Sequence, residues 1–139
     1  MYLQVELDEG AVKPTKAHDA DGGFDLYARE DALIPARGSY PFDTGVHISI
    51  PEGMVGFLKS KSGLNVKYGI TSEGVIDAGY TGSIVVKLYN NSDNDYNVKQ
   101  GNKITQLVFL PIPSITLREV SELRSDTERG NNGFGSSGV

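Results

Sequence analysis

The fold is indicated most clearly by residues 83–89, which read Ser-Ile-Val-Val-Lys-Leu-Tyr. Their apolar side chains recur with a period of two, which is typical of a β-strand with one buried face. The same period marks two further stretches, residues 45–50 (Gly-Val-His-Ile-Ser-Ile) and residues 103–110 (Lys-Ile-Thr-Gln-Leu-Val-Phe-Leu). Three such stretches in one short chain favour a β-sheet protein.

Around these stretches the sequence continues to favour short strands. The chain has 17 glycines and 6 prolines, and they separate brief apolar runs, as in many-stranded β-proteins. Turn residues fall at 35–38, 51–53 and 91–94, and only residues 62–68 fit a helix, with Ser62 near its N-cap. Weaker patterns predict strands at residues 2–7, 24–28, 32–34, 55–58 and 115–120. The predicted class is all-β, a jelly-roll-like barrel or sandwich.

Length and composition narrow the possible functions. The 139 residues suit one domain, and a hydrophobic share of 38% is lean enough to favour burial against sister chains. With no cysteine, disulfides and thiolate sites are excluded, and the spacing of His18 and His47 does not suggest a zinc pair. No apolar run approaches a membrane span, and the first residues lack a signal-peptide pattern. We expect a soluble, cytoplasmic protein.

The charge balance limits the partners. A net charge of −5 argues against a nucleic-acid-binding protein held by a basic face. It permits a small polyanionic ligand, because a few cations and backbone N–H groups can bind a phosphate inside an acidic protein.

The composition changes near residue 121. Residues 121–139 are mostly polar, which predicts a flexible arm attached to a β-domain formed by residues 1–120. Within the arm, residues 129–138 place one arginine and one phenylalanine among glycines and serines. That pattern is unusual for a tail that is merely solvated.

Several short patterns are ambiguous when taken singly. Asp77 in the turn Asp77-Ala78-Gly79-Tyr80 either bonds its own backbone or activates a water. The Lys61-Ser62-Gly63 loop is either ordinary surface or a phosphate site at a helix start. Asp25 is either a strand-edge carboxylate or a ligand for magnesium, and Gln106 lies either on a solvated face or in a site.

Together, these patterns resemble the five motifs of trimeric dUTPases, in the family's order and approximate spacing. The resemblance spans nearly the whole chain. The motifs are Asp-Ala-Asp-Gly-Gly-Phe-Asp-Leu-Tyr-Ala (19–28), Lys-Ser-Gly-Leu (61–64), Gly-Val-Ile-Asp-Ala-Gly-Tyr-Thr-Gly (74–82), Gly-Asn-Lys-Ile-Thr-Gln-Leu-Val-Phe (101–109) and the glycine-rich stretch 129–138.

The resemblance implies a homotrimer of jelly-roll-like subunits whose active sites lie at subunit boundaries. The arm of one chain would close over a neighbour's site, as lids do. The implied reaction is hydrolysis of dUTP to dUMP and pyrophosphate by attack of water on the α-phosphorus. It would limit uracil entry into DNA and supply dUMP for dTMP synthesis.

The resemblance also assigns roles to individual residues. Asp77 would activate the water, Gln106 would lie near the water and phosphates, and Tyr80 would pack on deoxyribose. Asp25 would hold Mg²⁺, through water. The remaining substrate-binding positions are Gly74, Val75, Ile76 and Val85 for uracil, Lys61, Ser62 and Gly63 for phosphate, and Arg129, Phe134, Gly135, Ser136 and Ser137 in the arm.

The chain departs from the family pattern at several positions. Lys61 replaces the usual arginine, so a two-pronged contact becomes a point charge. Gly79 replaces a common second acidic residue, and Thr71 stands where some members have asparagine. Asn102, Thr105 and Asn132 are milder changes.

Two other functions remain open at this stage. A dCTP deaminase shares the dUTPase fold and would need a glutamate base, for which Glu73 is the available residue. A dUTP-gated regulatory protein would use the nucleotide to change its affinity for a protein partner.

Overall fold

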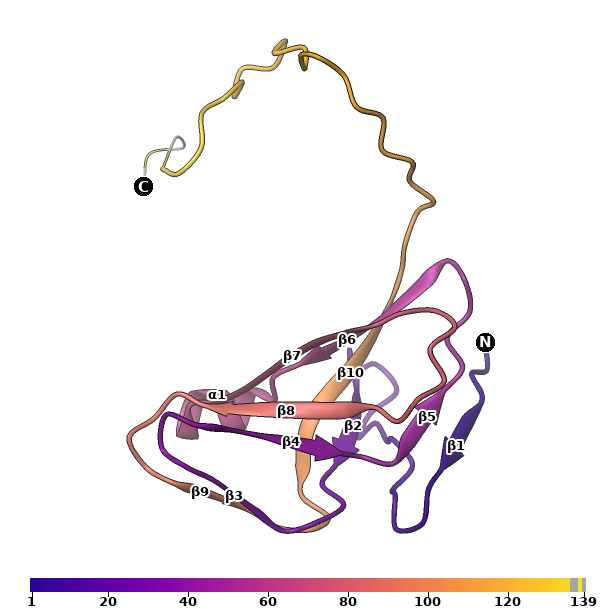
Figure 1. Cartoon of the computed structure of the whole chain (residues 1–139), viewed down its shortest axis with the longest axis vertical. Helices are drawn as coiled ribbons and strands as arrows, with labels where there is room; N and C mark the ends of the chain where they lie inside the picture. Colours follow the sequence, from indigo (N-terminus) through magenta and orange to yellow (C-terminus); the bar gives the residue numbers. More distant parts are fainter. Residues whose placement is uncertain (136–137, 139) are drawn as a thin grey trace.

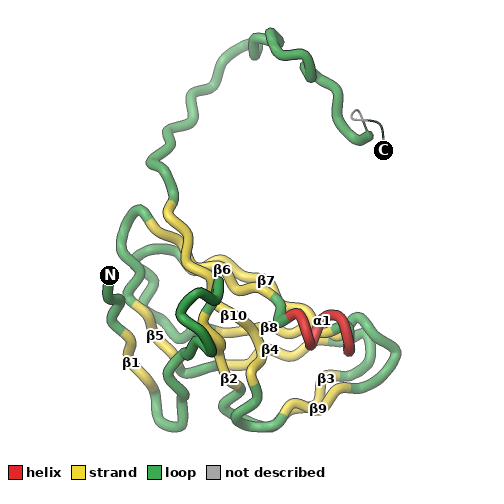
Figure 2. Tube along the Cα trace, turned by 180° about the vertical axis from the view of Figure 1, so that it is seen from behind, coloured by secondary structure: helices red, strands yellow, loops and turns green. Residues whose placement is uncertain are grey.

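The computed structural model describes residues 1–135 and 138. Figures 1 and 2 show a body of short strands with a small helix at one edge and a long arm leaving the body. In chain order the elements are β1 (Val5–Leu7), β2 (Phe24–Tyr27), β3 (Ala32–Ile34), β4 (Ser39–Asp43), β5 (Val46–Ile48), β6 (Met54–Lys59), α1 (Ser62–Tyr68), β7 (Ile70–Ile76), β8 (Val85–Asn90), β9 (Tyr96–Val98) and β10 (Lys103–Pro111).

The strands pair antiparallel in three curled sheets. The largest has the order β2-β10-β6-β7-β8-β4, and β1-β5 and β3-β9 form two-stranded sheets beside it. Strand β10 pairs with β2 through its first half and with β6 through its second half. This long strand therefore ties together segments that are far apart in the sequence.

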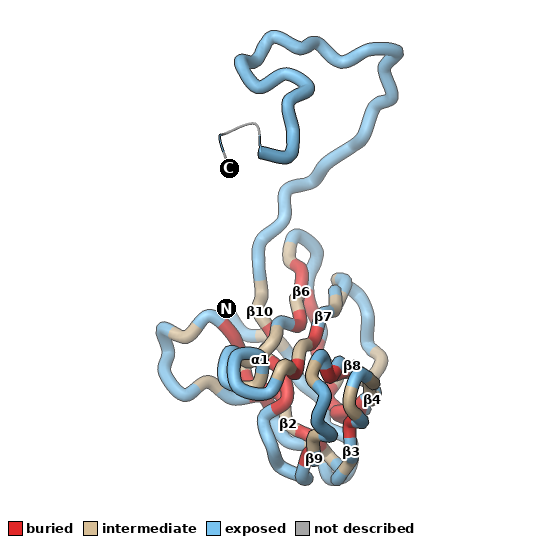
Figure 3. The backbone as a smooth tube through the Cα atoms, turned by 90° about the vertical axis from the view of Figure 1, so that its left-hand side faces the viewer, coloured by how far each residue is buried: buried red, intermediate tan, exposed pale blue. Residues whose placement is uncertain are grey.

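The core lies inside the curled sheets. Apolar side chains at alternate positions of β8 are buried, and the charged Lys87 between them points outward. Figure 3 shows the buried segments confined to the barrel, with the arm exposed along its described length. The core includes Leu26, Ile34, Phe42, Val46, Leu58, Ile70, Ile84, Val86, Leu88, Ile104 and Leu107. The all-β, jelly-roll-like class predicted from the sequence is confirmed.

Most predicted elements are present. The helix over residues 62–68 is confirmed, with Lys61 at the N-cap in place of the predicted Ser62. It ends at Gly69, whose positive φ of 69° suits a residue without a Cβ. None of the helices in the part of the chain that the structure describes is long and apolar enough to cross a membrane.

The strand predictions failed at four places. β4 was missed because Pro41 lies at its centre, and proline usually excludes a central strand. The short β9 and the first half of β7 were also missed. The strand predicted at residues 115–120 is wrong, since these residues are exposed and have no strand partner among the described residues.

The arm begins where β10 ends at Pro111. Residues 112–135 form no helix or strand and are exposed. In Figure 1 this segment leaves the barrel and curves through open space. The barrel thus completes its sheets without any contribution from the arm.

Leu107 provides a test of this architecture. It lies on β10 facing both β2 and β6 and is 0% exposed. We expect Leu107→Ala to lower the free energy of unfolding by about 2–5 kcal/mol, because it leaves a cavity at the junction of three strands. The matched control is Leu33→Ala on β3, where Leu33 is 47% exposed. Urea unfolding of both variants measures the difference, and equal losses would contradict the proposed core.

Candidate active site

A slot opens between β7 and β8 because the two strands are paired over only part of their length. Their ladder covers only Ile70–Ser72 against Leu88–Asn90. Beyond it, β7 pairs with β6 and the start of β8 pairs with β4. The resulting pocket has a volume of about 260 Å³ and is lined by Val75, Ile76, Asp77, Tyr80, Ser83, Ile84 and Val85.

Five of the residues assigned to substrate or chemistry therefore line one pocket. They are Val75, Ile76, Asp77, Tyr80 and Val85. The structure brings them together from both sides of the opening and from the turn at its end. Gly74 lies on the same strand, at the pair with Leu58 of β6, where a Cβ would come within 2.9 Å of the Leu58 side chain.

Asp77 stands at the rim of this pocket. The turn is closed by the Tyr80 N–H, which donates to the Asp77 carbonyl at 3.2 Å. The Gly79 N–H donates to the Ile50 carbonyl at 3.2 Å, and Gly79 has a positive φ of 83° that favours glycine. Within the described residues, no hydrogen bond or ion pair engages the Asp77 carboxylate. It is exposed and available to a water or a ligand.

Tyr80 folds back over the loop that follows it. Its hydroxyl donates to the Ser83 carbonyl at 2.8 Å. Gly82 lies under the ring, and a Cβ there would come within 2.4 Å of the Tyr80 hydroxyl oxygen. A Cβ at residue 82 would displace the ring, so Gly82 allows Tyr80 to lie here, and the hydrogen bond to Ser83 holds it.

Asp25 is the centre of a cluster of cations. It is buried on β2, and its two carboxylate oxygens pair with Lys61 and Lys103, the latter at 3.2 Å. Burial raises the pKa of Asp25, but the hydrogen bonds and charges of the two lysines outweigh this and lower it below its ordinary value. The same contact raises the pKa of Lys103. Lys103 was not singled out in the sequence, because only folding places it beside Asp25.

Gln106 lies next to this cluster and is partly buried. It pairs with Asp25 in the β2–β10 ladder, and its side-chain amide donates to the Ser60 carbonyl at 3.0 Å. Gln106 thereby contacts the segment that leads into Lys61, Ser62 and Gly63. The structure thus places the lysine loop, Asp25 and Gln106 side by side, as an electropositive cluster in an acidic protein.

The loop behind Tyr80 is held by side chains from the β4–β5 region. Asp43 accepts from the Ser83 hydroxyl and from the Gly45 N–H, and both contacts lower the pKa of Asp43. The buried Thr44 hydroxyl donates to the Ile84 carbonyl at 2.6 Å. His47 lies 2.7 Å from the Thr81 carbonyl through Nδ1. These supporting residues belong to no motif, and their role is visible only in the folded chain.

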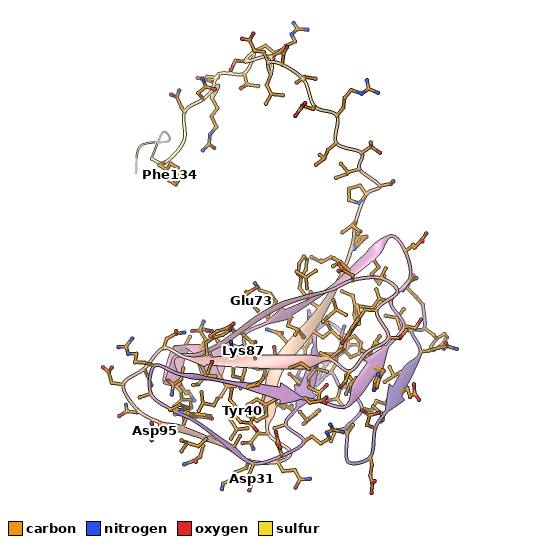
Figure 4. All side chains as sticks on the ribbon, viewed as in Figure 1. Asp31, Tyr40, Glu73, Lys87, Asp95 and Phe134 are labelled. Carbon is orange, nitrogen blue, oxygen red and sulfur yellow. The ribbon has the colours of Figure 1, made fainter. Side chains whose placement is uncertain are left out.

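The arm does not reach the pocket of its own chain. Phe134 is fully exposed, and Figure 4 places it at the far end of the arm, away from Glu73 and Lys87 on the sheet. Arg129 forms a hydrogen bond within the arm, where its Nε donates to the Asn132 carbonyl at 2.8 Å. Gly135 has a positive φ of 81°. Ser136 and Ser137 lie outside the described residues.

Comparisons with known proteins identify the family of the chain. The dUTPase family model matches residues 9–138. The chain therefore belongs to the dUTPase family. A curated relative from Eremothecium gossypii, a deoxyuridine 5'-triphosphate nucleotidohydrolase, is 43% identical over 138 residues, covering 98% of this chain and 90% of the relative. The protein of that name from Paramecium bursaria Chlorella virus 1 is 39% identical, covering 99% of this chain and 97% of the relative.

Solved structures give the same family. The dUTPase of Staphylococcus bacteriophage 80alpha, determined with dUpNHpp, has a TM-score of 0.92 and 34% identity, and the match covers 99% of each chain. A variant dUTPase from phage phi11 of S. aureus has a TM-score of 0.82 and 31% identity, covering 88% of this chain and 98% of that one. The latter structure is described as revealing the coordination of a structural Mg(II) ion.

The described residues contain no cluster of three or more histidine or acidic side chains able to hold a metal ion. Asp25 has the oxygen donors that magnesium prefers, but both of its oxygens are paired with lysines. A metal ion could approach Asp25 only through water, or after one lysine has turned away.

Glu73 does not fit the role of a deaminase base. It accepts from Lys59 Nζ at 2.5 Å, and it is not among the residues that line the pocket. Figure 4 shows it on the outer side of β7.

His47 makes the support of the loop after the Asp77–Tyr80 turn sensitive to pH. Its Nδ1 faces the Thr81 carbonyl, and its Nε2 lies 3.1 Å from the Asp8 carboxylate. Neither group can donate, so only the protonated ring satisfies both contacts. The pKa of His47 is raised above 6.5 by the Thr81 carbonyl first and by Asp8 next, with a smaller contribution from Glu6. The other charged groups near His47 are Asp43 and Arg29, and Arg29 pairs with both Asp8 and Asp43.

A raised pKa in the folded state means that this stabilisation is present in full below pH 6.5, the ordinary value, and is lost as the pH rises through the folded pKa. We expect the wild type to melt at a higher temperature than His47→Gln at about pH 5.5, and the difference to shrink by about pH 8.5. Thermal melts at both pH values measure it. A difference that does not change with pH would contradict the paired, protonated ring.

Proposed function

We propose that the chain hydrolyses dUTP to dUMP and pyrophosphate, with uracil bound in the slot between β7 and β8. The observation that carries the proposal is the pocket of about 260 Å³ with the Asp77 carboxylate at its rim, where it has no partner among the described residues. The family membership and the names of the relatives support the same activity.

The parting of the strands explains how the slot can select a base. Beyond Ser72, the edge of β7 that faces β8 has no ladder partner on that side. The backbone from Gly74 to Ile76 can therefore pair with the carbonyl and N–H groups of uracil. The 5-methyl group of thymine would crowd the narrow slot. The amino group of cytosine would face a backbone N–H that donates to the 4-carbonyl oxygen of uracil, so two donors would meet.

Tyr80 selects the sugar. Its ring is fixed against Gly82 and lines the pocket beside Asp77. In this position it packs on deoxyribose and leaves no room for a ribose 2′-hydroxyl.

The triphosphate extends toward the lysine-bearing loop. Ser62 and Gly63 present backbone N–H groups at the start of α1, and Lys61 supplies charge. When Lys61 turns from Asp25 to the phosphates, one carboxylate oxygen of Asp25 is released. Asp25 would then hold Mg²⁺ through water, and the ion would supply charge neutralisation to the triphosphate.

Asp77 performs the proton transfer. Its carboxylate orients a water and takes a proton from it as the water oxygen bonds to the α-phosphorus. The bond from the α-phosphorus to the bridging oxygen breaks in line, and the electron pair leaves with pyrophosphate. Gln106 holds the loop on the phosphate side and offers an amide to the water.

Pyrophosphate release from dUTP, dTTP, dCTP and UTP tests the substrate directly. We expect release from dUTP only, and ammonia from none of them. Robust ammonia release from dCTP would replace this proposal with a deaminase.

Asp77→Asn tests the general base. We expect turnover of dUTP to fall by about a hundredfold or more while binding of dUpNHpp stays near the wild-type value, because shape is kept and the base is lost. The control is Asp95→Asn, since Asp95 is not among the residues that line the pocket and accepts from the Ala36 N–H at 2.9 Å. Near-normal turnover by Asp77→Asn would remove Asp77 from the mechanism.

We also propose that the chain forms a homotrimer in which the arm closes a neighbour's site. Two exposed surfaces support this. The arm carries the exposed Ile115 and Leu117, and an apolar pocket of about 370 Å³ next to the N-terminus is lined in part by Phe24, Met54 and Phe109. In a closed site, Arg129 would bind phosphate, Phe134 would stack on uracil, and Gly135, Ser136 and Ser137 would donate to the γ-phosphate.

Mixed trimers test whether the arm acts on a neighbour. A chain lacking residues 129–139 keeps Asp77 but has no closing arm, whereas Asp77→Asn keeps the arm but has no base. Each alone should form an inactive trimer. Co-expression should restore part of the activity, because an intact arm can close over an intact base on another subunit. If the mixture stays inactive, either the arm closes over the site of its own chain or the arm is needed for folding. The size of the shortened protein in solution distinguishes these two explanations.

A further inference from the structure

The end of β6 is held in an unusual way. β6 pairs with β10 and β7 as far as Lys59, which faces Gln106 on one side and Glu73 on the other. Both ladders stop there, and the next residues lead directly to Lys61 at the start of α1. The carbonyl groups at this junction therefore need donors from outside the ladders.

Two neighbouring side chains of β10 supply those donors. The Thr105 hydroxyl donates to the Lys59 carbonyl at 2.9 Å, and the Gln106 amide donates to the Ser60 carbonyl at 3.0 Å. Thr105 is 0% exposed, so water cannot replace its contact. The path of the chain into Lys61 is thus set by side chains of the adjacent strand.

Ser72 of β7 completes a network from the other side. Its hydroxyl lies 2.7 Å from the Thr105 hydroxyl, and it must be the donor because the Thr105 hydrogen is directed to the Lys59 carbonyl. The Ser72 N–H donates to the Ser60 hydroxyl at 3.0 Å, and this hydroxyl donates to the Ser72 carbonyl at 3.3 Å. Ser72 is also buried. The three hydroxyls join β6, β7 and β10 with defined directions.

We propose that Ser60, Ser72 and Thr105 are positioning residues that set the phosphate loop, residues 61–63, for the triphosphate of the substrate. None of the three lines the uracil pocket, so none is expected to contact the base. They act through the backbone at Lys59 and Ser60, which fixes where Lys61 can place its charge. The inference rests on the proposed function, because it assigns the loop to the triphosphate.

A purely structural role makes a different prediction. If the network only stabilised the barrel, its loss would weaken the binding of every ligand to the same extent. A positioning role affects only ligands that carry phosphates. Deoxyuridine has the base and sugar without phosphate, and dUpNHpp has all three phosphates, so the pair separates the two roles.

The experiment uses Thr105→Val in the full-length protein. Valine keeps the shape and removes the hydroxyl, which leaves the Lys59 carbonyl without its donor. Loss of a hydrogen bond of this kind changes an equilibrium constant by about five- to tenfold. We therefore expect the affinity for dUpNHpp to fall by about five- to tenfold. Inhibition by deoxyuridine should be unchanged, and KM for dUTP should rise. Thr105→Ser restores a hydroxyl and should restore dUpNHpp binding.

A matched pair of serine variants provides a second measurement if Thr105→Val does not fold. Ser72→Ala removes one hydroxyl of the network and should weaken dUpNHpp by about twofold to fivefold. Ser92→Ala removes a hydroxyl from a different polar network, in which Ser92 donates to Asn90 at 2.8 Å, and should leave binding unchanged.

Each outcome supports or overturns the inference. Selective loss of dUpNHpp binding, with rescue by serine, supports it. Unchanged dUpNHpp binding, an equal loss of deoxyuridine binding, or failure of serine to restore binding overturns it. Absence of pyrophosphate release from dUTP by the wild type would instead overturn the proposed function, and the binding comparison distinguishes the two failures.

Discussion

The separation of β7 from β8 is the constraint on which the rest of the site depends. A strand edge can pair with only one neighbour on each side, and here the second half of β7 follows β6 while the first half of β8 follows β4. The opening between them is the pocket, and the turn that must join the two strands becomes its rim. Asp77 and Tyr80 lie at the site because they belong to that turn.

The charges of the site are arranged to suit a polyanion in an acidic protein. The chain has a net charge of −5, but Lys61 and Lys103 converge on the buried Asp25. Their attraction to Asp25 keeps two cations in place before any phosphate arrives. Asp77 differs from Asp25, since within the described part of the chain its carboxylate has no cationic partner. The Asp25 carboxylate holds two lysine side chains in place, whereas the Asp77 carboxylate is available to bind a water or a ligand.

Much of the fold follows from local patterns, and the remainder depends on tertiary contacts. The apolar period of two located β5, β8 and β10, because these strands bury one face. Pro41 concealed β4, whose pairing with β8 tolerates a proline at that position. The apolar residues near 115–120 suggested a strand, but a strand needs a partner, and no partner is available within the described chain. The class of fold was predictable, whereas exact pairing was not.

The site shows the same division. The five motifs identified Asp25, Gln106 and the pocket residues as a set, and the structure gathers these barrel residues into two groups, the pocket and the cluster around Asp25. The roles of Lys103, His47 and the Ser72–Thr105 pair could not be read from the sequence, because their contacts are with neighbours that are distant in the sequence. Support for a site comes from contacts that a linear pattern cannot express.

The proposed closure by the exposed arm has a consequence for the speed of turnover. Between Pro111 and Phe134 lie 22 residues, and a flexible chain of that length has a root-mean-square span of about 25 Å. Tethering at this range gives the arm a local concentration of about a millimolar at a nearby site. For the proposed closure over a neighbour's site, a contact with a dissociation constant of about a millimolar is then sufficient, and such a contact would release quickly once the products have formed. An arm with strong intrinsic affinity would instead hold the products and slow each cycle.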